Sequence, residues 1–211
     1  MIRKLSLLLL IGVLLALMTV PLAAQDDEFV FGVVLVGPKD DHGWSQAHYE
    51  GGQYAEEHLP GATMLLFESL NEADSPEATL LDVVTEMVDA GAKLIFTTSA
   101  SFEQDTDAVA AAFPDVVFIN ITGSNALEES PLPNVGNFNG LMEAPKAMAG
   151  CAAALTTETG KIGYLGALID PETRRLAASA YLGARYCYEN YRGMSAADLE
   201  YTVTWIGFWF N

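Results

Sequence analysis

The sequence predicts an α/β fold built from parallel sheets, because short apolar runs alternate with amphipathic stretches along the chain. In the longer stretches apolar residues recur every three or four positions, as Val83, Met87 and Ala90 do, and this spacing is typical of helices. Alternating strands and helices favour parallel strands joined by right-handed crossovers. Two groups of such units predict two Rossmann-like lobes, of which the second is incomplete.

The expected strands are short runs rich in β-branched and aromatic residues. They are Val30–Val36, Thr63–Phe67, Leu94–Thr97, Val116–Ile121, Ile162–Leu165 and Tyr201–Ile206. The expected helices are Trp44–His58, Pro76–Ala90, Phe102–Phe113, Met142–Thr156 and Thr173–Glu189.

Local capping signals support two of these helices. Ser75-Pro76-Glu77 has the order of an N-cap, a proline in the first turn and a first-turn acid, and Gly91 follows the last helical residue. Asp170-Pro171-Glu172 repeats the opening signal. Both segments are therefore expected to begin helices.

The segment 128–140 breaks the alternation with its prolines, asparagines and glycines. It predicts a long loop and a crossing between an N-terminal lobe, residues 25–137, and a partial C-terminal lobe, residues 138–211. Four expected strands precede the loop and two follow it. The chain ends on an apolar, aromatic segment, residues 204–211, with no helix to cover the last strand, so we expect a truncated protein.

Residues 1–24 have the pattern of a secretory signal, with a basic start, a long apolar run and small residues before a polar chain. Cleavage after Ala24 places Leu22 where a small residue is usual, so an uncleaved membrane anchor is the alternative. No cysteine lies near this site, which excludes lipid attachment there. We expect an exported protein, in the periplasm or at the outer face of the cytoplasmic membrane.

The chain is strongly acidic. Removal of residues 1–24 takes away Arg3 and Lys4 and leaves 8 basic and 28 acidic residues, a formal charge of −20. Such a surface repels phosphate backbones, so nucleic acid is not an expected partner. The two cysteines, Cys151 and Cys187, have no zinc-site spacing; two buried unpaired thiols are the simpler interpretation and a disulfide is the alternative.

The loop at residues 37–51 follows the first expected strand and leads into a helix, so it lies where ligands bind in open α/β sheets. Its sequence, Gly-Pro-Lys-Asp-Asp-His-Gly-Trp-Ser-Gln-Ala-His-Tyr-Glu-Gly, resembles the start of the basic membrane protein (BMP, PnrA-like) family. Further segments are similar to that family in the same order. They are residues 91–99, 113–118, 149–155, 161–164, 182–185 and 205–210.

The resemblance implies a type I periplasmic-binding fold and the substrate-binding component of an ABC importer. It also implies a purine nucleoside or nucleobase as the small-molecule ligand, a membrane permease as the partner, and binding without catalysis, metal or cofactor. Family members extend well beyond residue 211, so this chain lacks part of lobe two and is not expected to close properly on a ligand.

Three residues of the loop are candidate ligand contacts. The resemblance implies that Trp44 stacks on a purine ring, and its place beside Gly43 in a polar loop disfavours a core position. Asp41 has a carboxylate that suits ribose hydroxyls or base N–H groups, and it suits capping of the helix equally well. Ser45 stands where many relatives carry asparagine, a departure that weakens the case for purine specificity.

Residues at the ends of the next two strands complete the expected site. Thr98 and Ser99 end the third strand and Asn120 ends the fourth, so all three are expected at the same crevice. In lobe two, Ala178 and Ala180 fall in a stretch where relatives place larger ligand contacts. His48 is expected to be a structural histidine.

Two other classes of function remain as alternatives. A sensory module of the same fold would report the ligand to a membrane partner. A secreted hydrolase or nucleosidase would use Asp40, Asp41 and His42, although adjacent side chains in a loop rarely converge. No nucleophile elbow, phosphate-binding loop or metal motif is present in the sequence.

Overall fold

The computed structural model describes residues 28–127, 129 and 131–209, and these residues form two separate parallel sheets. The first sheet has the strand order β2-β1-β3-β4-β5, and the second pairs β6 with β7. The strands of the first sheet are β1 (Phe29–Val34), β2 (Ala62–Phe67), β3 (Leu94–Thr97), β4 (Val117–Ile121) and β5 (Val135–Phe138). Those of the second are β6 (Lys161–Gly166) and β7 (Glu200–Trp205). The predicted parallel α/β architecture is confirmed.

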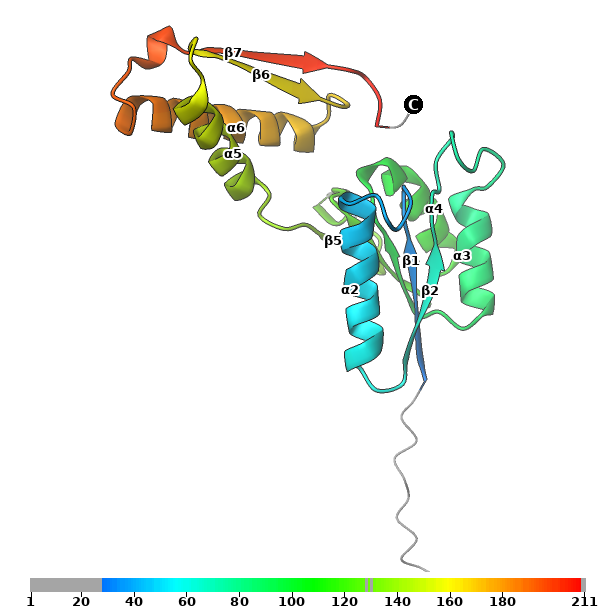
Figure 1. Ribbon diagram of the computed structural model, residues 1–211. Helices are drawn as coiled ribbons and strands as arrows, with labels where there is room; N and C mark the ends of the chain where they lie inside the picture. The colour runs from blue at the N-terminus through cyan, green and yellow to red at the C-terminus, as the bar shows by residue number, and fades with distance from the viewer. Residues whose placement is uncertain (1–27, 128, 130, 210–211) are drawn as a thin grey trace, which may run out of the picture.

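Helices connect the strands in the order expected for right-handed crossover units. The α-helices are α2 (Trp44–His58), α3 (Leu80–Asp89), α4 (Glu103–Ala112), α5 (Glu143–Thr156) and α6 (Pro171–Asn190). Three short 3₁₀ turns are η1 (Ala100–Phe102), η2 (Asn125–Leu127) and η3 (Ala196–Asp198). Figure 1 shows α2 on one face of the first sheet and α3 and α4 on the other.

Strand β1 lies at the centre of the first core, where its side chains alternate between the two faces of the sheet. Val30 and Val34 pack into the cluster beneath α3 and α4, whereas Phe31 and Val33 pack into the cluster beneath α2. A strand buried on both faces needs a continuous apolar run, and this is the run that β1 has.

Helix α3 begins later than its proline predicts. The expected start at Ser75-Pro76 is wrong, because these residues form a turn in which the N–H of Ala78 donates to the carbonyl of Ser75. The helix instead begins after Thr79, whose hydroxyl and backbone exchange hydrogen bonds with Asp82 in a capping box. Gly91 follows the helix with a φ of 98°, as a C-terminal stop requires.

Strand β5 lies inside the segment that the sequence predicts as a loop, and that prediction is wrong for residues 135–138. Two asparagines fasten this short edge strand. The Asn134 side chain donates to the carbonyl of Val116 at 2.9 Å, and Asn137 donates to the carbonyl of Asn120 at 3.1 Å. Asparagines often indicate a loop, but here Asn134 and Asn137 hold β5 against β4. The first sheet thus gains a fifth strand before the chain crosses to α5.

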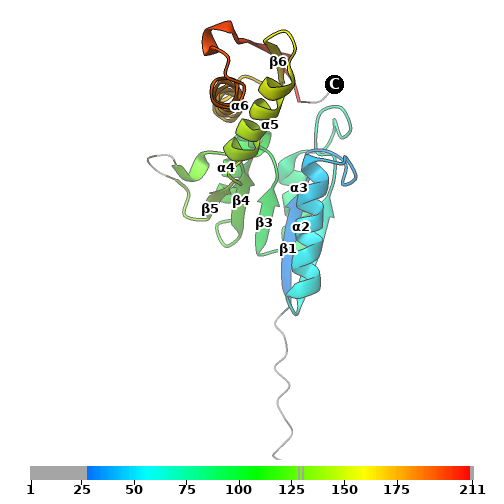
Figure 2. The same cartoon turned by 60° about the vertical axis from the view of Figure 1, so that its left-hand side comes forward.

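Helices α5 and α6 pack closely because small residues face each other at their crossing. A Cβ on Gly150 would come within 1.8 Å of the carbonyl oxygen of Ala180, and one on Gly183 within 2.0 Å of that of Ala147. No side chain fits at either glycine without moving the helices apart. Figure 2 shows α6 almost end-on beside α5, above the first sheet.

A disulfide between Cys151 and Cys187 joins the same two helices, with the Cα atoms 5.2 Å apart. The interpretation of two unpaired thiols is therefore wrong. The cysteines are 36 residues apart, and sequence spacing carries no information on whether two such helices meet. The close crossing at the glycines brings them together.

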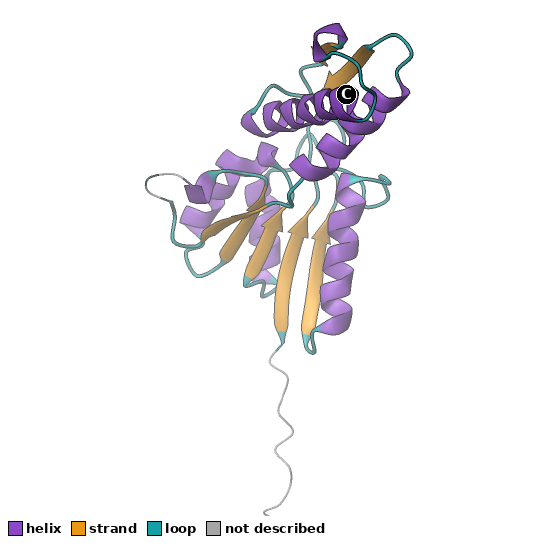
Figure 3. Cartoon of the chain, turned by 90° about the vertical axis from the view of Figure 1, so that its left-hand side faces the viewer, coloured by secondary structure: helices purple, strands orange, loops and turns teal. Residues whose placement is uncertain are grey.

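The first sheet points toward the second part of the chain. In Figure 3 the arrowheads of its strands face the region that carries α5 and α6, so the carboxyl ends of β1, β3 and β4 border that region. Among the described residues no helix has the length and apolar character needed to cross a membrane. The predicted signal segment, residues 1–24, lies outside them.

Candidate functional site

A cavity of about 350 Å³ lies between the carboxyl ends of the first sheet and the start of the second part of the chain. Its volume is in the range of small-molecule sites, and its lining is mostly apolar with a few polar groups. The lining residues from the first part include Asp41, Trp44, Ser45, Ser99 and Thr122. Those from the second part include Lys146, Tyr164, Glu172, Thr173, Leu176 and Trp209.

A larger hollow of about 890 Å³ runs along the β2–α3 connection, beside Asn71, Pro76 and Leu81. It includes none of the candidate ligand contacts predicted from the sequence. The smaller cavity lies at the strand ends, where ligands bind in folds of this kind, and it is the candidate site.

Trp44 presents a fixed aromatic surface to this cavity. It is the first residue of α2, the residue is 36% exposed, and its indole N–H donates to the carbonyl oxygen of Thr98 at 2.6 Å. The ring of His48 packs against the indole with the ring centres 4.6 Å apart, and its Nδ1 lies 2.7 Å from the carbonyl oxygen of Trp44. The indole is therefore held on its edge and backed by His48, which has the structural role predicted for it.

Asp41 lies at the edge of the cavity with its carboxylate committed to the start of α2. It accepts hydrogen bonds from the backbone N–H groups of Gly43 (2.8 Å), Ser45 (2.8 Å) and Gln46 (3.0 Å). Burial acts to raise the pKa of Asp41, but the hydrogen bonds from Gln46, Ser45 and Gly43 outweigh it and lower the pKa below the usual 3.8. Asp41 thus caps the start of α2 through these three hydrogen bonds.

Two of the predicted site residues turn their hydroxyls into the fold. Ser45 is 1% exposed, and its Oγ accepts a hydrogen bond from the backbone N–H of Gly37 at 3.1 Å. Thr98 is fully buried and donates from Oγ1 to the carbonyl of Val34 at 2.9 Å. Ser45 still borders the cavity, whereas Thr98 contributes only the carbonyl that holds Trp44.

Ser99 lines the cavity, whereas the predicted contact Asn120 is buried and is not among the lining residues. Ser99 also caps η1 by accepting from the N–H of Ser101. Asn120 is fully buried and donates from Nδ2 to the carbonyl of Ser99 at 2.8 Å and to Oγ1 of Thr97 at 3.0 Å. Gly123 lies directly over the Asn120 side chain. Asn120 therefore holds the backbone of Ser99, a lining residue, and does not line the cavity itself.

The second part of the chain supplies polar residues that sequence reasoning missed. Lys146 comes from α5 and Glu172 from the first turn of α6, and Tyr164 adds a second aromatic ring from β6. Glu172 lies in the Asp170-Pro171-Glu172 signal, which marks it as a first-turn acid and gives no sign of the cavity. Ala178 and Ala180 are not in the cavity lining.

Burial raises the pKa of the Glu172 carboxyl above the usual 4.5, and the nearby charge of Asp170 acts in the same direction. Hydrogen bonding from Thr122, the charge of Arg175 and hydrogen bonding from Asn139 oppose this increase. Glu172 is thus a half-buried acid in the lining of the cavity.

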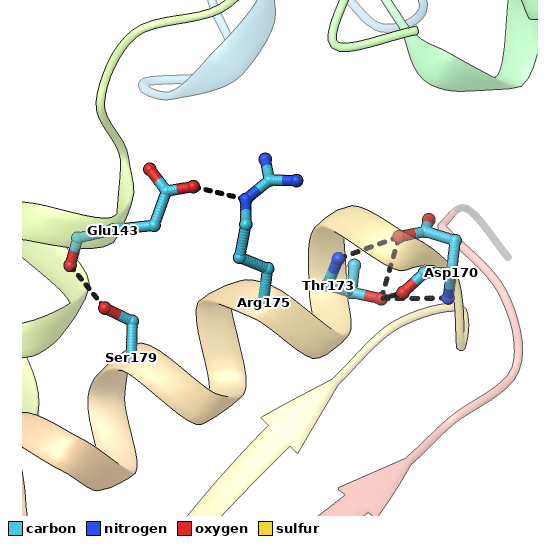
Figure 4. Close-up of polar contacts among 5 residues, drawn as sticks. All are labelled: Glu143, Asp170, Thr173, Arg175 and Ser179. Carbon is cyan, nitrogen blue, oxygen red and sulfur yellow. Dashed lines mark hydrogen bonds and ion pairs between the residues drawn. The ribbon is translucent and has the colours of Figure 1, made fainter. Parts of the chain in front are cut away.

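Figure 4 shows the polar contacts at the start of α6, the helix whose first turn carries Glu172. Asp170 accepts from the backbone N–H of Thr173 at 2.7 Å in a capping box. Arg175 forms an ion pair with Glu143, and Ser179 donates to the Glu143 carbonyl at 2.8 Å, so α6 is tied to the first turn of α5. The helices that carry Lys146 and Glu172 are therefore tied to each other by these contacts and by the disulfide.

The residues proposed for an enzyme do not converge. Among the described residues no hydrogen bond joins the side chains of Asp40, Asp41 and His42, and the Asp41 carboxylate is occupied by backbone N–H groups. No group of His, Cys, Asp and Glu in the described part of the chain could hold a metal ion. The cavity presents an aromatic surface and a few charged groups.

A family model described as ABC transporter substrate-binding protein PnrA-like matches residues 29–197. A purine-binding protein of Brucella abortus is 29% identical over 199 residues, which is 90% of this chain and 49% of that protein. An ABC transporter glucose-binding protein of Haloferax volcanii is 28% identical over 178 residues, 84% of this chain and 41% of that protein.

Among solved structures, an ABC transporter solute-binding protein of Aeropyrum pernix K1 matches with a TM-score of 0.65 at 19% identity. The match covers 85% of this chain and 48% of that one. It supports the periplasmic-binding type of fold predicted from the sequence. The chain spans about half the length of the curated relatives it matches.

Proposed function

Because the chain belongs to the PnrA-like family of ABC transporter substrate-binding proteins, we propose that it is the extracytoplasmic substrate-binding component of an ABC importer. The proposed ligand is a purine nucleobase or nucleoside, bound without chemical conversion and delivered to a membrane permease. The single observation that carries the choice of ligand is the indole of Trp44, fixed on its edge at the wall of the cavity.

A fixed aromatic plane suits a flat heteroaromatic ligand. Stacking of a base on an aromatic side chain contributes about 1–3 kcal/mol. The bond to Thr98 and the packing of His48 limit the motion of the indole before the ligand arrives, so little conformational entropy is lost on binding. The relative named as a purine-binding protein points in the same direction.

A sugar is the second candidate, because another relative is named as a glucose-binding protein. A hexose needs a partner for each buried hydroxyl group, since an unpaired buried polar group is costly. In this cavity Asp41, Ser45 and Thr173 already have hydrogen-bond partners within the protein. The mostly apolar lining therefore favours the purine.

Export accords with the disulfide between α5 and α6, because structural disulfides persist in oxidising compartments. The predicted signal at residues 1–24 would direct the chain there. Membership of the family is what supports the proposed delivery to a permease.

The test is calorimetric titration of the purified protein with purine nucleosides, nucleobases and glucose, and a parallel assay for release of free base. We expect purines to bind at least about tenfold more tightly than glucose, a difference of about 1.4 kcal/mol, with no free base released. Tighter binding of glucose would contradict the ligand assignment. Release of free base would contradict binding without conversion.

A further inference from the structure

Glu172 is the acidic residue that the second part of the chain contributes to the cavity lining. The sequence marks it as a first-turn acid but does not predict its place in the cavity. It is half-buried, and it lines the cavity together with Thr122 and Lys146. An ordinary first-turn acid of a helix projects into solvent, where it interacts with the helix dipole. The burial of Glu172 in the lining of the cavity needs another explanation.

An ionised carboxylate only accepts hydrogen bonds, at about four lone-pair positions on two neighbouring oxygens. Two oxygens side by side match a ligand edge that presents two adjacent N–H donors. Such paired, charge-assisted hydrogen bonds are stronger and more selective than single neutral ones.

Lys146 provides the opposite chemistry in the same cavity. Its ammonium group only donates hydrogen bonds, and it forms none of the ion pairs found among the described residues. A carboxylate pairs with donors and an ammonium with an acceptor such as a carbonyl oxygen. The cavity therefore offers one position for each type of ligand group.

We propose that Glu172 and Lys146 make this cavity selective for guanine-type purines over adenine-type purines. This inference rests on the proposed purine-binding function. Guanine carries a ring N–H beside its exocyclic amino group, two adjacent donors for Glu172, and a carbonyl oxygen for Lys146. Adenine places an acceptor nitrogen beside its amino group and has no carbonyl, so it leaves one carboxylate oxygen facing a lone pair. Sites built on such hydrogen bonds reject the mismatched ligand strongly.

The test is calorimetric titration of guanosine and adenosine into the wild type and Glu172→Gln. The glutamine amide keeps the shape of the side chain but presents one donor and one acceptor. We expect the wild type to bind guanosine at least about tenfold more tightly than adenosine, and Glu172→Gln to reduce this ratio below about threefold. The matched control is Glu189→Gln, an equal change of charge at an exposed position on the same helix, which keeps the wild-type ratio.

Lys146→Met provides a second variant that does not depend on the folding of Glu172→Gln. It is expected to weaken guanosine binding at least about fivefold and to change adenosine binding less than about twofold. An unchanged guanosine-to-adenosine ratio in both variants would overturn the inference and leave purine binding intact. Absence of binding to any purine in the wild type would overturn the proposed function along with the inference.

Discussion

Replacement of Cys151 and Cys187 by serine tests how the second part of the chain is held together. The disulfide joins α5 to α6 across a sequence separation of 36 residues. In the chain-entropy model, closing a loop of that length removes about 3.8 kcal/mol of conformational freedom from the unfolded state at 25 °C. Cys187 is only 3% exposed, so a serine there also buries a hydroxyl group and adds to the cost.

The expected loss is therefore about 3–5 kcal/mol, a large part of the stability of a typical domain. With a urea dependence of about 2 kcal/mol/M, the unfolding midpoint falls by about 2 M. The assay is urea unfolding followed by circular dichroism, with amide hydrogen exchange to separate α5 and α6 from the first sheet. Ala152→Ser, at an exposed position beside Cys151, is the control and is expected to shift stability by less than about 0.5 kcal/mol.

A midpoint shift below about 0.5 M in the double serine variant would refute this reasoning. So would two reactive thiols in the wild-type protein purified under oxidising conditions, because both sulfur atoms are in the disulfide.

Gly150→Ala is expected to lower the free energy of unfolding in urea by at least about 3 kcal/mol, because the added methyl group would come within 1.8 Å of the Ala180 carbonyl oxygen. Gly51→Ala is the control and should not destabilise the protein, because the added atom meets nothing within 4 Å. Asp41→Ala should lower the unfolding free energy by about 1 kcal/mol at pH 7. The lowered pKa of Asp41 means that its contribution is present above its unfolded value of 3.8 and is lost as the pH falls through the native pKa, so the variant should lose its disadvantage in acid titrations. Glu172 behaves in the opposite way, because its raised native pKa stabilises the folded state below about pH 4.5, and this contribution is lost as the pH rises through the native pKa. Glu172→Gln should therefore gain stability relative to the wild type as the pH rises through that window. An equal difference in unfolding free energy at every pH would contradict this sign.

Helix α2 shows what local sequence can predict. Its bounds, Trp44–His58, agree with the prediction, because an amphipathic repeat ends just before Pro60, which has no N–H for a helical hydrogen bond. The sequence also indicates Asp41 as a capping residue, because the first N–H groups of a helix have no partner within the helix and a carboxylate just before it can accept from them.

Strand β5 shows where local reasoning fails. Asn134 and Asn137 indicate a loop by their composition, but their side chains donate to backbone carbonyls of neighbouring segments and fasten the strand. These partners lie 17 and 18 residues away along the chain. No window short enough to be read for periodicity contains both sides of these contacts.

The candidate site divides in the same way. Asp41 and Trp44 come from the connection after β1 and Ser99 from the one after β3, and all three line the cavity. Glu172 and Lys146 reach it from α6 and α5, more than 100 residues after Trp44, and only the crossing of the chain after β5 brings them there. Position at a strand end predicts nearness to the crevice, but it does not show which hydroxyl groups turn inward, as that of Thr98 does.

The central claim is that the fixed indole of Trp44 holds a purine in the cavity between the two parts of the chain. The most direct measurement is calorimetric titration of guanosine into Trp44→Ala, with Tyr54→Ala as the control for loss of an exposed aromatic ring on the same helix. Stacking worth about 1–3 kcal/mol predicts that Trp44→Ala weakens binding by about 5-fold to 150-fold, while Tyr54→Ala binds as the wild type does. An affinity of Trp44→Ala within about twofold of the wild type would contradict the account.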